Sequence, residues 1–399
     1  MSDDDDVAGV VVAIVHGVSD DDPTRSVPRV VVAPDSFKGS LAAADVAAAM
    51  ADGVRSARSD ADVVACPMAD GGEGTLDALL ASWGVAPRAV DAPDALGRPG
   101  RARYGISADG RLGVLELAEA SGLPTVADVA PRPRDADTTG SGVVARALLD
   151  AGVAEILVCL GGSASTDGGS GLLRGLGVRL LDDDGAELPP GGGGLARLAA
   201  VDDAALHPRA RAVRWRLAVD VTNPLLGPAG AAAVYGPQKG AAPDDVAALD
   251  AALARWAAVI GADPAVPGTG AAGGVPAGLL GVLGADCVEI TAGGLLVAEA
   301  VGLPVLLTGA DLVLTGEGAL DDQSVQGKVV GTIAELAGGH VPVVAIAGRV
   351  ELDAGAVARA GLTAAFSIAP GPVPLETLLP RTAELVRETA AHVARLALR

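Results

Sequence analysis

Three lysines are the residues of this chain whose type and surroundings point most directly to chemistry. The 399-residue sequence carries 29 basic residues, and only Lys38, Lys239 and Lys328 are lysines. Each lies beside a glycine in a short polar segment. A lysine ammonium is a compact point charge, and the planar fork of arginine does not replace it at every phosphate site. We therefore predict that the three lysines contact anionic groups; the alternative is that they lie by chance on solvated turns.

Polar segments also follow six apolar runs that we predict to be buried strands. These predicted strands cover residues 30–33, 63–68, 155–160, 215–221, 311–314 and 343–346. Ligands of open α/β sheets bind at the carboxyl ends of the strands, so the segments together predict a polar cleft. The binding candidates in them are Ser36, Gly71, Gly72, Gly161, Gly162, Ser163, Gly168, Gly169, Asn223, Gly316 and Gly318.

The segment 161–171 is the richest of these in glycine. Such a loop exposes successive backbone N–H groups and can form a concave anion site; the alternative is a flexible turn. Asp167 within it favours binding, because a carboxylate beside a phosphate site usually serves a Mg²⁺ bridge or acts as a base. The chain has no Walker A motif, since Val329 rather than Ser or Thr follows its candidate Gly327-Lys328. It also has no Gly-x-Gly-x-x-Gly at the start of the first βα unit.

Carboxylates near the same strand ends complete the inventory for phosphoryl transfer. This reaction needs cations on the phosphates, carboxylates that hold Mg²⁺, and a carboxylate that accepts the proton of the substrate hydroxyl. The candidates for these carboxylate roles are Asp35, Asp70, Glu73, Asp167, Asp220, Glu317 and Asp321.

Composition argues against several other classes of function. The net charge of −21 disfavours nucleic acid and anionic membranes as partners. No apolar run approaches the roughly 20 residues of a membrane span, and acidic residues stand where a secretory signal would carry basic ones. Four scattered histidines have no metal-ligand spacing. Cys66, Cys159 and Cys287 are far apart in apolar runs, so we expect buried, reduced thiols in a cytoplasmic protein.

The elements that must position these residues alternate between strand and helix. The alternation is clean at both ends of the chain, whereas residues 88–118 show the short alternating runs of antiparallel strands. We predict an α/β fold in which a Rossmann-like, three-layer parallel-sheet domain is formed by residues 27–88 and 295–399. A mixed α/β domain at residues 89–294 interrupts it, and the active site is expected in the cleft between the two.

Two further predictions concern the inserted segment. A helix is expected to begin at Pro243, and its apolar stripe includes Trp256, which is therefore a core residue. The glycine-rich stretches 190–194 and 268–274 are expected to be loops.

Residues 1–26 differ from the rest of the chain. They contain seven aspartates and one arginine, which predicts a disordered acidic extension. An alternative hypothesis is that the native chain starts at Val27, which an initiator GTG codon would encode.

The order of the motifs resembles that of bacterial glycerate kinases of the glycerate 2-kinase type, whose first strand ends in Pro-Asp-Ser-Phe-Lys. Each matching segment is of modest specificity, and their combination is highly specific. They run in order over residues 29–399 and cover 33–41, 67–75, 161–171, 220–227, 236–240, 270–274, 315–328 and 366–372.

The resemblance implies ATP-dependent, Mg²⁺-assisted phosphorylation of D-glycerate in organic acid and glyoxylate–glycerate metabolism, with 2-phosphoglycerate as the favoured product. It implies a two-domain α/β enzyme in which all three lysine segments belong to the active site. Gly273, Gly274 and Gln323 lie in matching segments and join the binding candidates. The partner is then a small molecule, with no nucleic acid and no membrane, and a homodimer stays open.

On this hypothesis the residues divide into two groups. The catalytic candidates are Asp35, Lys38, Asp167, Asp220, Lys239 and Lys328. Lys328 or Lys38 would bind the ATP phosphates, Asp35 or Asp220 would be the base, and Lys239 or amides near Gly273 would bind the substrate carboxylate. The metal-ligand candidates are Asp70, Glu73, Glu317 and Asp321, with Asp167 as a further ligand candidate.

Two alternatives stay open. The acceptor could be another small hydroxy acid, or the protein could be a non-catalytic sensor of glycerate or nucleotide. A sensor could lose Mg²⁺ ligands, so the intact set of carboxylate motifs argues against that class.

Overall fold

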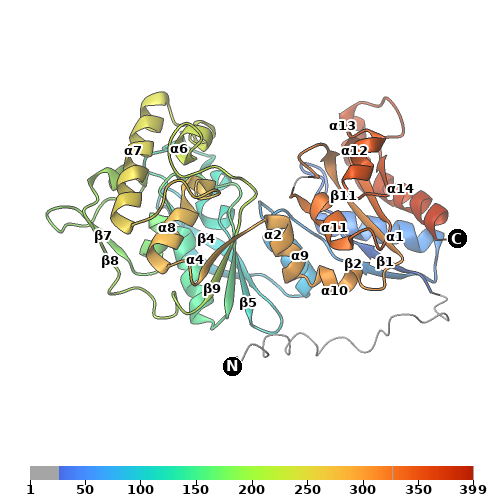
Figure 1. Ribbon diagram of the computed structural model, residues 1–399, viewed down its shortest axis with the longest axis horizontal. Helices are drawn as coiled ribbons and strands as arrows, with labels where there is room; N and C mark the ends of the chain where they lie inside the picture. Colours follow the sequence, from blue (N-terminus) through green and yellow to red (C-terminus); the bar gives the residue numbers. More distant parts are fainter. Residues whose placement is uncertain (1–26, 326, 399) are drawn as a thin grey trace, which may run out of the picture.

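The computed structural model describes residues 27–325 and 327–398, which form two lobes, each built on its own large β-sheet (Figure 1). The acidic extension predicted at residues 1–26 lies outside the described residues. One sheet takes its strands from both ends of the described chain, and the other takes its strands from the middle. This is the strand distribution expected of a discontinuous domain with an insertion. Within the described residues, no helix is both long and apolar enough to span a bilayer.

The first sheet is entirely parallel, with the strand order β13-β12-β11-β1-β2. Its strands are β1 (Arg29–Val32), β2 (Asp62–Ala65), β11 (Leu312–Leu320), β12 (Val343–Val350) and β13 (Ala364–Ser367). The chain proceeds from β1 to β2 on one side and returns as β11 on the other, so the strand order reverses at β1. Such a switch point opens a crevice beyond the carboxyl ends of the strands.

Helices cover both faces of this sheet, which explains why its central strands read as unbroken apolar runs. The helices α1 (Ala43–Ala57) and α14 (Thr382–Ala397) pack on each other and on one face through Val30, Met50 and Ile346. The other face is covered by α2 (Thr75–Trp83), α9 (Gly293–Ala300), α10 (Leu303–Leu307), α11 (Val329–Ala337) and α12 (Ala354–Arg359). The short helix α13 (Leu375–Leu378) precedes α14.

The second sheet has six strands in the order β10-β9-β6-β5-β4-β3. They are β3 (Arg88–Pro93), β4 (Pro99–Ile106), β5 (Leu112–Glu116), β6 (Glu155–Cys159), β9 (Arg214–Ala218) and β10 (Val288–Thr291). The pairs β3–β4 and β4–β5 are antiparallel, as the pattern of residues 88–118 predicts, and the remaining pairs are parallel. A separate antiparallel ribbon joins β7 (Arg179–Leu181) to β8 (Ala200–Asp202).

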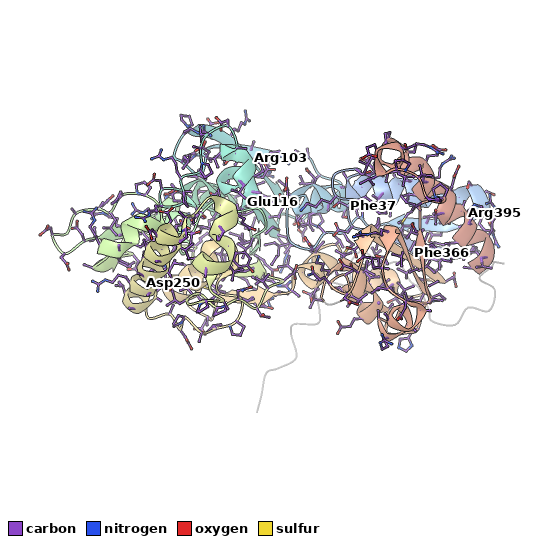
Figure 2. All side chains as sticks on the ribbon, turned by 90° about the horizontal axis from the view of Figure 1, so that it is seen from above. Phe37, Arg103, Glu116, Asp250, Phe366 and Arg395 are labelled. Carbon is purple, nitrogen blue, oxygen red and sulfur yellow. The ribbon has the colours of Figure 1, made fainter. Side chains whose placement is uncertain are left out.

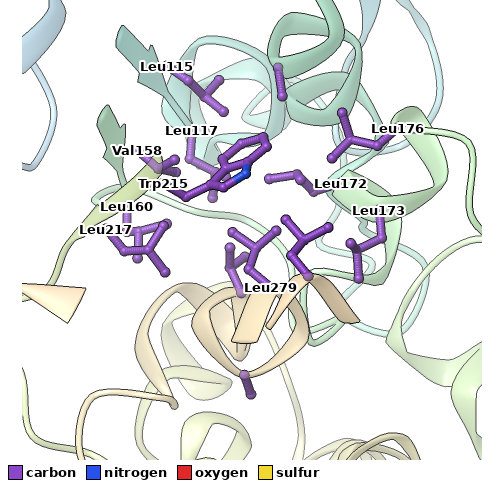
Figure 3. Close-up of a cluster of buried hydrophobic side chains, with 14 of the residues drawn as sticks. Leu115, Leu117, Val158, Leu160, Leu172, Leu173, Leu176, Trp215, Leu217 and Leu279 are labelled. Atoms are coloured by element: carbon purple, nitrogen blue, oxygen red, sulfur yellow. The ribbon is translucent and has the colours of Figure 1, made fainter. Parts of the chain in front are cut away.

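The second lobe has its own core around Trp215 of β9, which is fully buried. Its indole N–H donates to the carbonyl of Ala210 at 2.8 Å, and leucines such as Leu115 and Leu172 surround the ring (Figure 3). Trp256 is also fully buried, which confirms its assignment to the core. The helices of this lobe are α3 (Ala118–Ser121), α4 (Thr139–Asp150), α5 (Ser170–Gly175), α6 (Ala231–Tyr235), α7 (Pro243–Ile260) and α8 (Val275–Leu283).

A shared apolar core joins the two sheets. It contains Val31 and Met68 from the first lobe and Val114 and Leu157 from the second, with Leu76 of α2 packed among them. The helices α2 and α9 therefore lie between the lobes, as their central position in Figure 1 shows. This packing sets the two rows of strand ends in a defined relation to each other.

Two details differ from the predictions. The stretches expected to be loops contain short 3₁₀ helices at Gly192–Arg197 and Ala271–Gly273, because buried small and apolar residues anchor each turn against the lobe. Cys66 and Cys159 are buried free thiols, but Cys287 is only half-buried because it lies in the turn before β10, near the surface.

The contact between α1 and α14 predicts an unusual response to alanine. A Cβ atom at Gly53 would lie 2.3 Å from the carbonyl oxygen of Arg387, so the two helices would have to separate. Alanine favours a helix over glycine by about 1 kcal/mol, but overpacking costs about 1–3 kcal/mol. We expect Gly53→Ala to lower the melting temperature. Gly371→Ala, whose Cβ meets nothing within 4 Å, should leave it unchanged. Equal melting temperatures would contradict this packing.

Candidate active site

A pocket of about 250 Å³ opens between the two sheets at the carboxyl ends of their strands. Its lining residues include segments that follow β2, β6 and β9 in the chain, together with the segment that contains Lys239. Its lining includes the predicted residues Asp70, Gly71, Gly72, Gly161, Gly162, Ser163, Asp220 and Lys239. The remaining lining is mostly apolar or amide in character and consists of Leu123, Leu160, Ala218, Val219, Val221, Tyr235, Gln238, Ala271 and Ala272.

The two walls of the pocket meet at glycine residues, whose neighbours are backbone atoms or the methyl group of an alanine. A Cβ atom at Gly161 would lie 2.5 Å from the Cα of Gly72, which belongs to the other lobe's strand end. A Cβ at Gly71 would lie 2.4 Å from the Cβ of Ala218, and one at Gly293 would lie 1.8 Å from the carbonyl oxygen of Asp70. Glycine is therefore required at these close approaches, and Gly71 and Gly161 line the pocket.

Lys239 provides the positive charge at one end of the pocket. Its side chain is 4 % exposed, and its ammonium donates to Ser163 Oγ at 2.8 Å and to the carbonyl oxygen of Ser165. Burial lowers the pKa of Lys239 to about 8, and the negative charge of Asp167 opposes this shift. The ammonium is thus held in place in a site that can accept an anion.

Three carboxylates influence one another in the first lobe: Asp35 and Asp70 follow the ends of β1 and β2, and Glu317 lies within β11, which continues past the predicted strand end at residue 314. Burial raises the pKa of Asp35 to about 7, and the charges of Asp70 and Glu317 add to the shift. The amide of Ser36 donates to Asp35 Oδ1 at 2.6 Å and works in the opposite direction. Burial also raises the pKa of Glu317, whose Oε1 is buried without a hydrogen-bond partner. The group therefore carries concentrated negative charge at the switch point of the sheet.

Asp220 lies at the rim of the pocket, exposed to solvent, beyond the end of β9. Its Oδ1 accepts a hydrogen bond of 2.7 Å from the amide of Gly293, at the N-terminus of α9. Nearby protein atoms desolvate the carboxylate and raise its pKa to about 6, and the charge of Asp70 contributes in the same direction. The charge of Lys328 opposes this shift.

The other two lysines lie on the side of the first lobe. Lys328 is half-buried at the N-cap of α11, and its charge lowers the pKa values of both Asp220 and Glu317. Lys38 is exposed in the turn after β1, where its amide lies 3.5 Å from the position of a Cβ on Gly318. Lys328 therefore lies near both Asp220, which lines the pocket, and Glu317. The exposed side chain of Lys38 could reach a ligand from solvent.

The donor set is compatible with a Mg²⁺ ion that also uses substrate oxygens. Over residues 27–325 and 327–398, no three His, Cys, Asp or Glu side chains converge closely enough to enclose a metal. Mg²⁺ usually keeps waters and takes only one or two protein carboxylates together with phosphate oxygens. The unpartnered Oε1 of Glu317, beside Asp70, is a free acceptor of the required kind.

The other two metal candidates are placed differently. Glu73 is exposed at the start of α2 and does not line the pocket. Asp321 lies near enough to Glu317 to raise its pKa, but Asp321 Oδ1 accepts hydrogen bonds from the amides of Gln323 and Ser324. These bonds lower the pKa of Asp321 and form its own turn.

Asp167 lies inside the second lobe and not on the pocket wall. The residue is fully buried, and its carboxylate accepts hydrogen bonds from Thr138 N, Thr138 Oγ1, Gly169 N and Gly171 N at 2.7–3.2 Å. These donors lie at the N-termini of α4 and α5, so the carboxylate joins two helices. Gly168 and Gly169 share this buried position, where the Trp256 indole donates to the carbonyl of Gly168.

The remaining binding candidates support the walls. The side-chain amide of Asn223 donates to the carbonyl oxygen of Ala229 and accepts from the Tyr235 hydroxyl. Gly273 packs against the carbonyl of Ser165. Gly274 caps α8, Gly316 lies within β11 and accepts from the amide of Asp35, and Gln323 is exposed in its turn.

Several residues of the site were not predicted. Tyr235 and Gln238 line the pocket, and their proximity to Lys239 in the chain was a usable signal. Ala272 also lines it and has a φ of 50°, a conformation that glycine prefers and that no sequence pattern revealed. Glu116 ends β5 and is 3 % exposed beneath the Gly72 loop, and a lone glutamate at the end of an apolar strand was its only signal.

Comparison with known proteins adds independent findings. The sequence model of the family described as "Glycerate kinase family" matches residues 30–398. The chain is 43 % identical over 376 residues to a glycerate kinase of Bacillus subtilis, covering 92 % of this chain and 97 % of that protein. It is 41 % identical over 346 residues to the glycerate 2-kinase of Escherichia coli K12, covering 85 % and 90 %. A solved Salmonella typhimurium LT2 structure, provisionally called glycerate kinase 2, superposes with a TM-score of 0.83 at 40 % identity, covering 93 % and 98 %.

The contrast between Asp167 and Asp220 can be tested by stability. In Asp167→Asn an amide N–H₂ replaces one accepting oxygen, which leaves buried donors unpaired at a cost of about 1–3 kcal/mol. We expect a melting temperature several degrees lower. Asp220 has a raised pKa, so its ionised form destabilises the folded state at pH 7, and Asp220→Asn should keep or raise the melting temperature. A larger loss in Asp220→Asn than in Asp167→Asn would contradict these environments.

Proposed function

The chain belongs to the glycerate kinase family, and from this membership we propose that it transfers the γ-phosphoryl group of ATP to a hydroxyl of D-glycerate. The favoured product is 2-phosphoglycerate. The observation that carries the proposal is a small pocket with a buried ammonium, Lys239, at one end and the carboxylates Asp70 and Asp220 on its wall. A small hydroxy acid offers the complementary groups, an anionic carboxylate and neutral hydroxyls.

Lys239 is proposed to bind the carboxylate of glycerate. Its ammonium is held by Ser163 and Ser165, so little side-chain entropy is lost when the substrate binds. Desolvation strengthens its attraction for an anion, and the ion pair would be a charge-assisted hydrogen bond. In a protein of net charge −21, this local positive charge is what permits an anionic substrate to bind.

Asp220 is proposed as the base that accepts the proton of the attacking hydroxyl. It lines the same pocket as Lys239, and its pKa of about 6 keeps the carboxylate ionised near neutral pH while making it more basic than an ordinary aspartate. The amide of Gly293 orients one of its oxygens, Oδ1. The other oxygen is proposed to face the substrate hydroxyl.

The phosphates of ATP are proposed to bind between the carboxylate group and the glycine contacts. Lys328, with Lys38 from the exposed turn, would neutralise phosphate charge, and the amides near Gly72 and Gly161 would donate to phosphate oxygens. Asp70 and Glu317 would hold Mg²⁺ with Asp35 beside them. When bound, the ion neutralises negative charge on the phosphate oxygens during transfer.

A reducing compartment is proposed for this reaction. The three cysteines are free, and two of them are buried, which supports the cytoplasmic location expected from the sequence.

The product assay tests the function directly. The purified protein is supplied with ATP, Mg²⁺ and D-glycerate, and product is read through enolase with and without phosphoglycerate mutase. We expect a signal without the mutase, which identifies 2-phosphoglycerate. A signal only with the mutase would mean transfer to the 3-hydroxyl, and no signal from folded protein in either assay would contradict the proposed activity.

The role of Lys239 predicts a pH dependence. Its pKa of about 8 means that the ammonium is present below pH 8 and is lost as the pH rises, so kcat/KM for D-glycerate should fall about tenfold per unit above pH 8. Lys239→Met should raise the KM for glycerate about 10- to 100-fold at pH 7, since a charged hydrogen bond is removed.

Lys38→Met is the matched control for this prediction, because it removes a lysine on the phosphate side. It should leave the KM for glycerate within about twofold of the wild-type value. A flat pH profile up to pH 9.5, or a wild-type KM for glycerate in Lys239→Met, would remove Lys239 from carboxylate binding.

A further inference from the structure

We propose that Glu116 is a positioning residue for phosphoryl transfer, whose carboxylate holds the N-terminus of α2 and thereby fixes the Asp70–Gly72 segment against the pocket. Glu116 belongs to the six-stranded sheet, whereas the segment that it fixes follows β2 of the five-stranded sheet. The inference rests on the proposed function for its kinetic test, and its structural test is independent of that function.

The buried carboxylate of Glu116, at the end of a strand of one sheet, accepts two hydrogen bonds from the segment that follows β2 of the other sheet. Its Oε1 accepts a 3.0 Å hydrogen bond from the amide of Gly74, and its Oε2 accepts one of 2.9 Å from the amide of Leu76. Gly74 is the N-cap residue of α2, so both donors belong to the first turn, where amides have no partner within the helix. The positive end of the helix dipole stabilises the carboxylate further.

No cationic side chain pairs with Glu116 in the part of the chain that the structure describes. The residue is 3 % exposed, and burial raises the pKa of its carboxyl group. A buried carboxylate is costly unless its oxygens are satisfied, and here the helix amides supply the hydrogen bonds. The amides of Gly74 and Leu76 would in turn lose their partner if Glu116 were replaced.

Two further hydrogen bonds connect the first turn of α2 to Asp70. The hydroxyl of Thr75 donates to the carbonyl of Gly72 at 2.7 Å, and the amide of Gly72 donates to Asp70 Oδ1 at 3.0 Å. Gly72 also abuts Gly161, the residue that opens the glycine-rich loop after β6. Displacing the first turn of α2 would therefore move Asp70 relative to the pocket while leaving Lys239 in place.

A second contact of α2 offers a matched control. Arg103 of β4 pairs with Asp77 of α2 at 2.8 Å and with Glu119 at 2.6 Å, on the solvent side of the helix. Figure 2 shows that Arg103 and Glu116 lie in the same part of the second lobe. The Arg103 side chain is 43 % exposed, and such surface pairs contribute little to stability. Arg103→Met thus removes a link between the same sheet and Asp77, in the first turn of the same helix, while both hydrogen bonds of Glu116 stay in place.

The kinetic test compares Glu116→Gln with Arg103→Met. The glutamine accepts from one amide but presents an N–H₂ group to the other. We expect kcat to fall about 10- to 100-fold, because a displacement of about 1 Å can cost that much, with KM for D-glycerate within about twofold. Arg103→Met should keep kcat within about twofold.

Rates are normalised to the folded fraction measured by circular dichroism. Glu116→Asp, which keeps two accepting oxygens, should recover part of the lost kcat and serves if Glu116→Gln does not fold.

The structural test measures hydrogen–deuterium exchange of the segment 70–76. We expect faster exchange there in Glu116→Gln than in the wild-type protein, and unchanged exchange in Arg103→Met. Wild-type kcat in Glu116→Gln, or unchanged exchange in the segment, would overturn the proposal. If the wild-type protein does not phosphorylate glycerate, the proposed function fails, and the exchange measurement still decides whether Glu116 fixes the segment.

Discussion

The structure depends on the direct backbone contact between the strand ends of its two sheets. Gly72 meets Gly161, Gly71 meets Ala218, and Gly293 meets the carbonyl of Asp70, all at distances that leave no room for a Cβ atom. Side chains at these positions would separate the lobes and open the pocket to solvent. The contact instead brings the strand ends of both lobes to one pocket, and the shared apolar core around α2 and α9 keeps them there.

Charged groups of both signs lie along this contact, and burial shifts the pKa values of several of them. Burial raises the pKa of Asp35 to about 7, and repulsion from Asp70 and Glu317 adds to the shift. Lys239 lines the same pocket as Asp70, and burial lowers its pKa to about 8. In both cases burial disfavours the charged form of the side chain. An anion beside Lys239, or a cation beside the carboxylates, would replace the stabilisation that water gives to these charges.

The sequence predicted the fold class and the polar segments after β1, β2, β6 and β9, because apolar runs and the turns after them depend on local residues. It ended two strands too early, since β11 and β12 continue through their polar residues to Leu320 and Val350, where pairing between the two strands keeps them extended. It also placed Asp70, Asp220 and Lys239 at one cleft. It did not distinguish Asp167, in a glycine-rich loop, from the carboxylates at the pocket, since Asp167 is also bound by Thr138 at the start of α4, 29 residues away in the chain. Glu116 escaped prediction for the same reason, because its partners lie about 40 residues away in the chain.

The placement of Asp167 and Glu116 shows how carboxylates serve two purposes in one fold. Each is buried and accepts amide hydrogen bonds at the first turn of a helix, and neither lines the pocket. Both satisfy donors that helix formation leaves unpaired, and both thereby fix the glycine-rich segments that precede their helices. Glycine gives those segments the close approach that the ligand requires but no rigidity of its own. On the proposal made for Glu116, buried carboxylates hold such segments in place through hydrogen bonds to the helices that follow them.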